Sequence, residues 1–376
     1  MHGRGSSRIL PSYWATSASD SRPCDKALCG LDADKAAMGK RELNILFSCV
    51  GSSVGLLGAF RRAMAELGLT GKIIVSDQTI TAAALHFGDA SAVLPAPGSE
   101  AYVPALLALV EKHEAGLLVP LGDADLPLLA GARERFLAAG CTVVVGSEPV
   151  VAMCADGGRF AEALSQAGLR VLRTVGLEEF RRRPFFPCLV CPVSRPNRAK
   201  GLVIHSEADF ARRRAGFTRP VLIQPHLACR DFCVDVYRSR DGVVRRIVPW
   251  QPLGFRGPEV DKGVTARGAE VIVETIRLAG LLGDAWGVFR CRCSRTEDGA
   301  VWFRGVSLRF DDGVELSIAA GADLPGMLLR EVLGQPIATE VDGFREGLLM
   351  LRYEEAAFVR ADEPASLPGY ETPNFT

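Results

Sequence analysis

The chain has 376 residues, and its 44 basic and 44 acidic side chains give a formal net charge of zero. A dedicated nucleic-acid binder normally carries a basic excess, so this balance argues against one. Hydrophobic residues make up 48% of the sequence, as in soluble globular proteins, and no apolar run reaches the roughly 18–20 residues of a membrane-spanning helix. We therefore expect neither nucleic acid nor a membrane as a partner.

The first forty residues mix Gly, Ser, Arg and Asp without apolar periodicity. They also lack the apolar segment of a signal peptide. Two interpretations stay open for this stretch. Either residues 1–41 form a disordered tail, or translation starts at Met38 and most of the tail does not belong to the protein.

From residue 43 onward, short apolar strands alternate with amphipathic helices. Strands are predicted at residues 43–50, 72–77, 91–94, 116–121 and 142–146, and helices from about 51 to 67, at 102–113 and at 125–139. This alternation is typical of a parallel sheet with helices on its faces. We therefore predict a Rossmann-like unit over residues 42–149.

Two features of this unit bear on function. The turn between Gly51 and Gly58 matches the dinucleotide-binding motif G-x-G-x-x-G poorly, because its spacing is wrong, and a tight turn is the favoured interpretation. Asp77, Asp123 and Asp125 follow strand ends, where open α/β sheets bind ligands. Helix capping is the alternative for these three carboxylates.

After residue 150 the pattern changes to α+β. Helices are predicted at 157–168, 207–215 and 270–282, and strands at 188–193 and 221–224. Two antiparallel hairpins are predicted, 232–239 with 243–249 and 287–294 with 300–310, each around an Asp-Gly turn. We divide this half into a small unit (150–222), a larger unit (223–352) and a poorly ordered C-terminal tail (353–376).

Eleven cysteines are an odd number and do not suit a disulfide scaffold in a chain of this length. Cys188 and Cys191 have the spacing of zinc ligands, but within a strand they point to opposite faces, whereas Cys291 and Cys293 share a face. We favour reduced thiols in the core over a metal site, and hence a cytoplasmic protein. Arg outnumbers Lys by 37 to 7, which indicates a GC-rich genome, in our interpretation a bacterial one.

Several short motifs in the second half of the chain indicate a protein family more specifically than its predicted helices and strands do. They are Phe186-Pro187, Gln224, Val234-Asp235-Val236, residues 259–265, Arg309-Phe310 and residues 313–323. In this order, behind a Rossmann-like unit, they resemble the ATP-grasp superfamily, and most closely its carbamoyl-phosphate-synthase-like branch, over about residues 43–350. The resemblance implies a Rossmann-like pre-ATP-grasp domain followed by a two-subdomain ATP-grasp fold.

The resemblance also implies a chemistry. Members of the superfamily transfer the γ-phosphoryl group of ATP to a carboxylate, and an amine then attacks the acyl phosphate. Catalysis of this kind depends on positioning and on cations that stabilise the phosphoryl oxygens. The implied ligands are therefore ATP, Mg²⁺ held by oxygen ligands, and a small-molecule carboxylate or nucleotide.

Most of the matching ligand positions are substituted here. The early phosphate-binding lysine falls on Gly157, the strand lysine on Cys191, and the glycine-rich phosphate loop on residues 194–200. The metal ligands of the last hairpin fall on Gly305 and Ser307, and the ligand of its partner strand on Arg292. These substitutions argue against Mg²⁺-dependent phosphoryl transfer of the usual kind.

Some residues still match the family pattern. The resemblance assigns Arg309 and Lys262 to the phosphate or substrate side, as the catalytic residues. It assigns nucleotide contacts to Lys200, Gln224, Asp231 and Arg256. Lys200 could also be an ordinary surface lysine, and Asp231 a solvated turn residue.

Arg290 and Arg292 alternate on one strand, so both point to the face that would hold the metal. Two guanidinium groups there could replace Mg²⁺ and bind an anion or nucleotide directly. Alternatively, Asp311 and Asp312 neutralise them in an internal salt-bridge network. We count Arg290 and Arg292 among the expected nucleotide-binding residues and assign no metal ligand.

Three hypotheses for the function follow. The first is a nucleotide- or anion-binding pseudoenzyme with weak or no turnover. The second is an active ATP-dependent carboxylate–amine ligase whose metal site is rebuilt from Asp311 or Asp312. The third is a structural or regulatory partner without a ligand. A homodimer is a further expectation, since exposed apolar surface on Rossmann-like units often pairs.

Overall fold

The computed structural model describes residues 41–192, 201–217, 220–256 and 259–359. The described residues from Glu42 onward form one compact unit. Residues 1–40, 193–200, 218–219, 257–258 and 360–376 lie outside the described residues, and Lys200 is among them. None of the described helices is long and apolar enough to cross a membrane.

The N-terminal strands form a parallel sheet of five, in the order β5-β4-β2-β6-β7. The strands of this sheet are β2 (Asn44–Ser48), β4 (Ile73–Asp77), β5 (Ala90–Val93), β6 (Ala115–Pro120) and β7 (Thr142–Val143). Two shorter strands, β1 (Arg41–Glu42) and β3 (Leu69–Thr70), lie outside this sheet. The central strands contain uninterrupted apolar runs, such as residues 45–47 of β2 and 73–75 of β4, because helices cover both of their faces.

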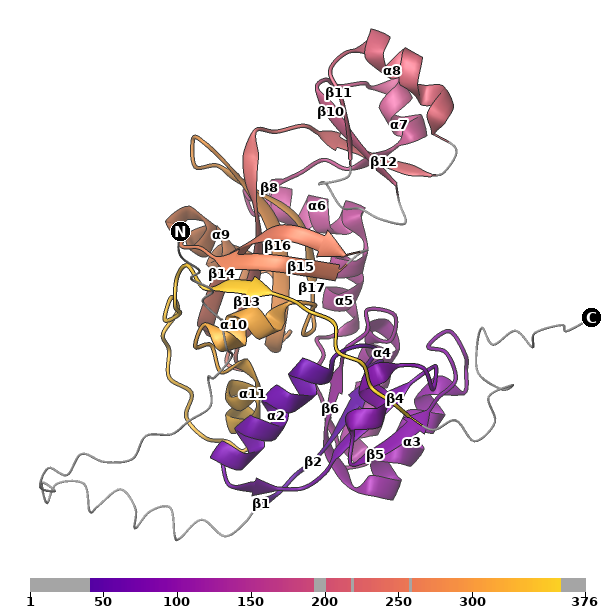
Figure 1. Ribbon diagram of the computed structural model, residues 1–376, viewed down its shortest axis with the longest axis vertical. Coiled ribbons are helices and arrows are strands. Elements are labelled where there is room, and N and C mark those ends of the chain that lie inside the picture. Colours follow the sequence, from indigo (N-terminus) through magenta and orange to yellow (C-terminus); the bar gives the residue numbers. More distant parts are fainter. Residues whose placement is uncertain (1–40, 193–200, 218–219, 257–258, 360–376) are drawn as a thin grey trace, which may run out of the picture. The chain divides into compact units, whose positions relative to one another are not determined.

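Alternate residues of each central strand pack against different helices. Ile45 and Phe47 belong to the same core as α2 (Val54–Glu66), whereas Leu46 belongs to the core of α3 (Tyr102–His113) and α4 (Leu126–Ala138). A short 3₁₀ helix, η1 (Ala83–Phe87), joins β4 to β5. The sheet with its helices is the lower part of Figure 1. This is the Rossmann-like arrangement that the alternation of strand and helix predicts.

Helices α5 (Glu148–Ala155) and α6 (Gly157–Gln166) and strand β8 (Arg170–Val171) lead to a small sheet with its own core. Its antiparallel strands follow the order β11-β10-β12-β9. The elements of this region are β9 (Val175–Gly176), α7 (Leu177–Arg182), β10 (Cys188–Pro192), β11 (Leu202–Ile204), α8 (Glu207–Arg213), η3 (Arg214–Gly216) and β12 (Val221–Pro225).

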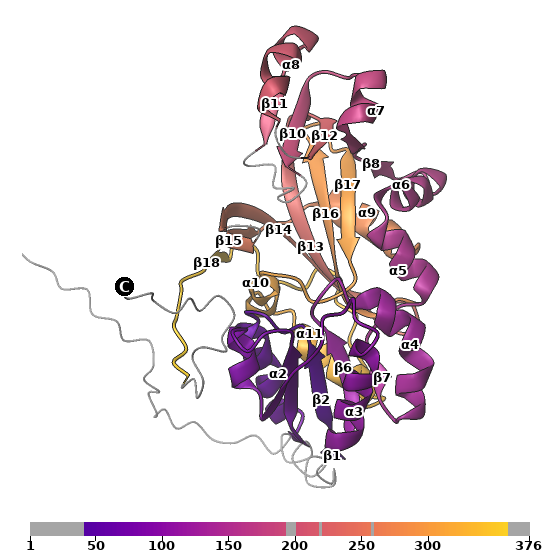
Figure 2. The same cartoon turned by 90° about the vertical axis from the view of Figure 1, so that its right-hand side faces the viewer.

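The largest sheet has seven strands in the order β18-β15-β14-β13-β16-β17-β8. All neighbours are antiparallel except β17 and β8. Its new strands are β13 (Cys229–Arg238), β14 (Val244–Arg256), β15 (Glu259–Thr265), β16 (Gly287–Thr296), β17 (Val301–Ser307) and β18 (Leu349–Leu351). Figure 2 shows β13, β16 and β17 running side by side. The helices of this region are α9 (Ala269–Ala279), α10 (Val314–Ala319) and α11 (Leu324–Val332).

The predicted class, α/β followed by α+β, is confirmed, and so are both hairpins. Several predicted ends are wrong. The strand predicted at 142–146 ends at Val143, and the strand predicted to end at residue 249 continues to Arg256. The helix predicted to reach residue 282 ends at Ala279, before Gly280, and the strand predicted to reach residue 310 ends at Ser307, because Leu308 and Phe310 turn into the core. The domain boundaries within the compact unit stay a prediction.

Candidate ligand site on the large sheet

One face of the large sheet carries polar side chains opposite one another. Residues two apart on a strand share a face, and the register of β13 and β16 pairs Asp235 with Arg290, Cys233 with Arg292, and Asp231 with Ser294. On the other side of β16, strand β17 places Ser307 opposite Arg290 and Gly305 opposite Arg292. The positions that the sequence match assigned to metal ligands, Arg292, Gly305 and Ser307, therefore do lie together.

Arg290 is enclosed in this sheet, with 1% of its surface exposed. Its Nε donates to Asp235 Oδ1 at 2.6 Å, and its guanidinium lies 5.0 Å from the centre of the Trp250 ring. Trp250 and Ser317 donate to the other oxygen of Asp235, Oδ2. Arg290 is therefore part of the interior, and we withdraw its assignment as a nucleotide contact. For this arginine, the alternative of an internal salt-bridge network is the better description, but its carboxylates are Asp235 and Asp311, and Asp312 contributes only its backbone carbonyl.

Asp311 gathers three guanidinium groups. Its carboxylate lies 2.6 Å from Nη2 of Arg292, 3.3 Å from Nη1 of Arg309 and 3.7 Å from Nη1 of Arg290, and its side chain is 3% exposed. Burial alone would raise the pKa of this carboxyl, but the three guanidiniums outweigh it and lower the pKa to about 2. Asp311 is thus an ionised anchor for arginines. This role does not suit a ligand of a rebuilt metal site.

Arg292 differs from Arg290 in being open to solvent, with 58% of its side chain exposed. Its Nη2 donates to Asp311 Oδ2, and its Nε and Nη1 make no hydrogen bond within the described residues. A guanidinium offers five N–H donors in a fixed plane. Arg292 therefore keeps donors available for an incoming anion.

Arg309 is held by a carboxylate from the N-terminal sheet. Its Nε and Nη2 donate to the two oxygens of Asp123, both at 2.8 Å, and Ser307 Oγ donates to Asp123 Oδ1 at 3.1 Å. The Arg309 side chain is only 15% exposed, whereas that of Asp123 is 64% exposed. The expected catalytic arginine thus lies beside Ser307, and Asp123 occupies its Nε and Nη2.

Arg304 is a further charged residue of this face, and the sequence analysis did not select it. A register shift in the β16–β17 pair brings Arg304 beside Ser294, where Nε donates to Ser294 Oγ at 2.9 Å and Nη2 donates to Asp231 Oδ1 at 2.8 Å. Asp231 is therefore fixed by a guanidinium and a hydroxyl, so it is more than a solvated turn residue. The sequence signal for Arg304 was a charged side chain within a predicted strand, directly after the apolar residues 301–303.

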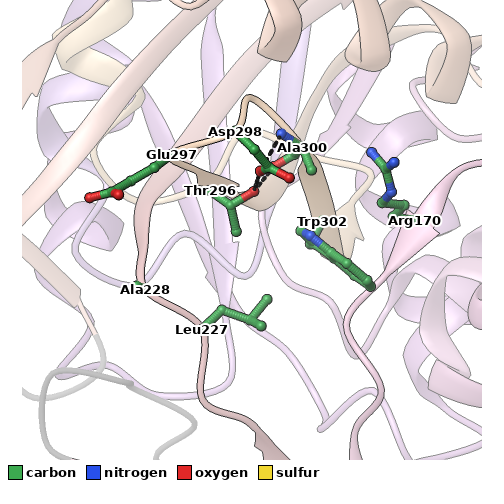
Figure 3. Close-up of a pocket in the computed structure, with 8 residues that line it drawn as sticks. All are labelled: Arg170, Leu227, Ala228, Thr296, Glu297, Asp298, Ala300 and Trp302. Atoms are coloured by element: carbon green, nitrogen blue, oxygen red, sulfur yellow. Dashed lines mark hydrogen bonds between the residues drawn. The ribbon is translucent and has the colours of Figure 1, made fainter.

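An open pocket of about 420 Å³ lies at the turn end of the β16–β17 hairpin. Its lining combines apolar and charged side chains: Arg170, Leu227, Ala228, Thr296, Glu297, Asp298, Ala300 and Trp302. Figure 3 shows Trp302 and Arg170 on one side of the pocket and Leu227 with Ala228 on the other. Trp302 pairs with Ser294 in the sheet, so the pocket continues the polar row of Asp231 and Arg304.

A second polar cluster lies in the N-terminal sheet. Asp125 is fully buried, and its Oδ2 accepts hydrogen bonds from Ser48 at 2.6 Å and from Tyr102 at 3.0 Å, while Oδ1 has no partner within the described residues. Burial raises the pKa of this carboxyl more than its hydrogen bonds lower it. Asp125 stands at the N-cap of α4 without a capping hydrogen bond, so the alternative of helix capping does not hold for it. Asp77 instead binds the backbone amides of Gly51 and Gln78.

Three comparisons relate this chain to known proteins. Residues 45–144 match the model of the PylC-like N-terminal domain family. Among solved structures, L-amino acid ligase from Bacillus licheniformis is 16% identical, with a TM-score of 0.60 over 82% of this chain and 78% of the ligase. N5-carboxyaminoimidazole ribonucleotide synthetase, in its ADP complex, is 15% identical, with a TM-score of 0.58 over 81% and 80% of the two chains. No curated protein sequence matches the chain.

Biotin carboxylase from Campylobacter jejuni, in its β,γ-ATP complex, is 15% identical, with a TM-score of 0.59 over 82% of this chain and 74% of that enzyme. The chain has the ATP-grasp fold. At identities of 13–16% these likenesses establish the fold alone. The resemblance inferred from the sequence motifs is thus confirmed at that level.

Four further residues were expected at the nucleotide or substrate site, and three of them lie within the described residues. Gln224, at the end of β12, donates to Thr174 Oγ1 at 2.8 Å. Arg256 pairs with Glu354 and lies 3.5 Å from Asp261, so carboxylates already flank it. Lys262 is exposed on β15, opposite Leu351 of β18. Lys200 lies outside the described residues, and these four positions stay predictions.

The metal of the usual ATP-grasp reaction does not fit this donor set. Mg²⁺ takes oxygen ligands. An arginine, a glycine and a serine stand at the three matching positions, so only Ser307 has a side-chain oxygen there, and its hydroxyl donates to Asp123. In the part of the chain that the structure describes, no group of three or more His, Cys, Asp or Glu side chains is placed to hold a metal ion. The nine cysteines within the described residues form no disulfide bonds with one another.

Proposed function

We propose that this ATP-grasp protein binds a nucleotide or a related phosphorylated anion on the polar face of its large sheet, with weak or no turnover. The observation that carries the proposal is Arg292. Its guanidinium is exposed to solvent and fixed by Asp311 at one nitrogen, at the position to which the resemblance assigns a metal-binding Glu or Gln. A cation built into the chain would take over the charge neutralisation that Mg²⁺ supplies elsewhere.

The pocket beside Trp302 supports a nucleotide over a bare anion. Its volume of about 420 Å³ lies within the range of small-molecule sites. The indole of Trp302 and the side chain of Leu227 offer apolar surface to a base, and an aromatic ring stacks on any base without a sequence preference. The polar row of Asp231 and Arg304 connects this pocket to Arg292.

The chain's own residues define what the site would do. Arg292 and Arg304 would neutralise phosphate oxygens by charge-assisted hydrogen bonds. Asp231 would accept hydrogen bonds from ribose hydroxyls. With no carboxylate or amide ligands for Mg²⁺ at the matching positions, we derive no phosphoryl-transfer step.

Thermal unfolding of the full chain with ATP and ADP, each in Mg²⁺ and in EDTA, tests the proposal. We expect a rise in Tm that persists in EDTA, by roughly 5 °C when the ligand is at a hundred times its Kd. Arg292→Ala should lose the EDTA-resistant rise. The matched control is Arg295→Ala, which removes a guanidinium from the opposite face of the same strand, where Arg295 pairs with Glu270.

Other outcomes favour the other hypotheses. A rise that requires Mg²⁺, together with ADP release, would contradict the proposal and favour a ligase with a metal site that we have not identified. Absence of any rise would favour a structural or regulatory partner. An EDTA-resistant rise that Arg292→Ala leaves unchanged would show binding without the role that we assign to Arg292.

A further inference from the structure

The contact between Asp123 and Arg309 has the form of a bound ligand. A carboxylate with both oxygens on one guanidinium, and one of them also on the Ser307 hydroxyl, is held as a small carboxylate substrate would be. Asp123 comes from the loop after β6 of the N-terminal sheet, 186 residues away from Arg309 in sequence. The carboxylate of Asp123 therefore occupies the place beside Arg309 and Ser307 that the oxygens of an anionic ligand would take.

The carboxylate of Asp123 adds a negative charge to the group of ionised side chains around Asp311. Asp235 and Asp311 face three guanidiniums, those of Arg290, Arg292 and Arg309. Asp123 adds a third carboxylate at hydrogen-bond distance, and Asp312 acts on Arg309 from further away. Withdrawal of Asp123 would free Nε and Nη2 of Arg309, which an anion could then bind.

The backbone on both sides of Asp123 is fixed, whereas its side chain is not enclosed. A Cβ atom on Gly122 would lie 2.8 Å from Cys49 Cβ, so the loop packs directly on the end of β2. Two residues further, Asp125 is fully buried in its network with Ser48 and Tyr102. Asp123 itself is 64% exposed. It can therefore leave Arg309 by rotation of its side chain alone, without movement of the loop.

We propose that Asp123 is an internal competitor that occupies an oxyanion subsite formed by Arg309 and Ser307, and that a carboxylate or phosphoryl group of the external ligand displaces it. The inference rests on the proposed function, because it concerns the same face of the sheet. It adds a regulatory element: the resting site is closed by its own carboxylate, and affinity is reduced by the fraction of time that Asp123 occupies Arg309.

Calorimetric titration of the full chain in EDTA with inorganic phosphate, and separately with malonate, tests this inference. If Asp123 occupies Arg309 for about nine-tenths of the time, Asp123→Ala should lower the Kd of the matching anion about tenfold. Asp123→Asn keeps the shape without the charge and should give a gain in the same direction. Addition of Arg309→Ala to the Asp123→Ala chain should abolish the gain.

The matched control is Glu134→Ala, which removes a carboxylate from helix α4; its side chain is 79% exposed and lies beside Arg133. A gain for phosphate identifies a phosphoryl subsite, and a gain for malonate identifies a carboxylate subsite. Equal affinities of the wild-type, Asp123→Ala and Asp123→Asn chains for both anions would overturn the inference.

Titration of the same chains with ATP in EDTA separates this inference from the proposed function. If ATP binds and depends on Arg292, but the Asp123 variants show no gain for any anion, the internal competitor is wrong and the nucleotide site stands. If phosphate or malonate shows the gain while ATP binds to none of the chains, the subsite stands and the nucleotide site is wrong.

Discussion

Two buried carboxylates, one in each half of the molecule, show how partners decide the state of the same side chain. Asp125 in the N-terminal sheet and Asp311 beside the large sheet are 0% and 4% exposed. Asp125 receives hydrogen bonds from hydroxyl groups, and burial raises its pKa above the usual value of 3.8. Asp311 faces three guanidiniums, and its pKa is lowered to about 2.

The difference separates two uses of a buried acid. Neutral donors cannot compensate the desolvation of a carboxylate, so Asp125 is driven toward its protonated form and works as a hydrogen-bond hub for Ser48 and Tyr102. Positive partners do compensate it, so Asp311 stays ionised and fixes the arginines of the candidate site. The first half of the molecule thus uses a buried acid for packing, and the second uses one to arrange charge.

The largest expected effect comes from breaking the charged cluster at its buried centre. Arg290→Met leaves Asp235 enclosed without its cation, and removal of one partner of a buried pair costs about 3–5 kcal/mol. Urea denaturation of the variant and the wild-type chain measures this loss. Arg295→Met, which removes a partly exposed arginine paired with Glu270 on the same strand, is the control and should cost less than about 1 kcal/mol. A loss below about 1 kcal/mol for Arg290→Met would show that the cluster does not need its central cation.

The neutral network should give a smaller loss. Asp125→Ala leaves the hydroxyls of Ser48 and Tyr102 without their acceptor and opens a small cavity, which together cost about 2–3 kcal/mol. Asp125→Asn retains an acceptor oxygen and should lose about 1 kcal/mol. The same denaturation assay ranks the two variants, and equal losses would indicate that the cavity, rather than the hydrogen bonds, dominates.

The fold could be predicted from the sequence to a large extent, because its signals are local. Apolar runs such as Ile45 to Phe47 are uninterrupted only in strands that are covered on both faces, and Asp-Gly turns mark both hairpins. Strand β15 was missed as an element, since its sequence Glu-Val-Asp-Lys-Gly-Val-Thr alternates weakly and contains a central glycine. Helices α10 and α11 are short, and their positions depend on tertiary packing.

The family resemblance predicts which residues of the site lie together, but it does not predict the burial and the partners of each side chain. The hairpin turn fixes the register only as far as Cys293 and Phe303, and a shift beyond that pair puts Gly305 rather than Arg304 opposite Arg292. The meeting of Arg292, Gly305 and Ser307 therefore follows from the family resemblance and not from the turn. The fate of each arginine depends on contacts that are distant in the chain. Arg290 is enclosed by Trp250 and Asp235, and Arg309 is paired with Asp123 across 186 residues. The sequence of one strand does not show which distant residues its side chains will contact.

The pH dependence of stability should differ in sign between the two acids. The folded pKa of Asp311 lies below its usual 3.8, so its contribution is complete above about pH 4 and is lost as the pH falls toward 2, by roughly 2 kcal/mol. The folded pKa of Asp125 lies above 3.8, so its contribution is complete below about pH 4 and is lost as the pH rises through the folded value.

Urea denaturation between pH 2.5 and 8, for the wild-type, Asp311→Asn and Asp125→Asn chains, checks these signs. The stability difference between the wild type and Asp311→Asn should grow as the pH rises from 2.5 to 5. The difference between the wild type and Asp125→Asn should shrink as the pH rises from 4. Parallel pH profiles for the two variants would mean that both acids share one protonation state in the folded chain.

The smallest effect on stability is expected for Arg292→Ala, although Arg292 lies only two residues from Arg290 on the same face. Its side chain is 58% exposed and its pair with Asp311 has solvent on one side, so the loss should stay below about 1 kcal/mol. Asp311 keeps Arg290 and Arg309 as partners, which limits the cost further. A small loss of unfolding free energy, together with loss of the EDTA-resistant rise in Tm with ATP, would assign Arg292 to ligand binding and Arg290 to the interior. A loss of unfolding free energy as large as that of Arg290→Met would instead make both arginines structural.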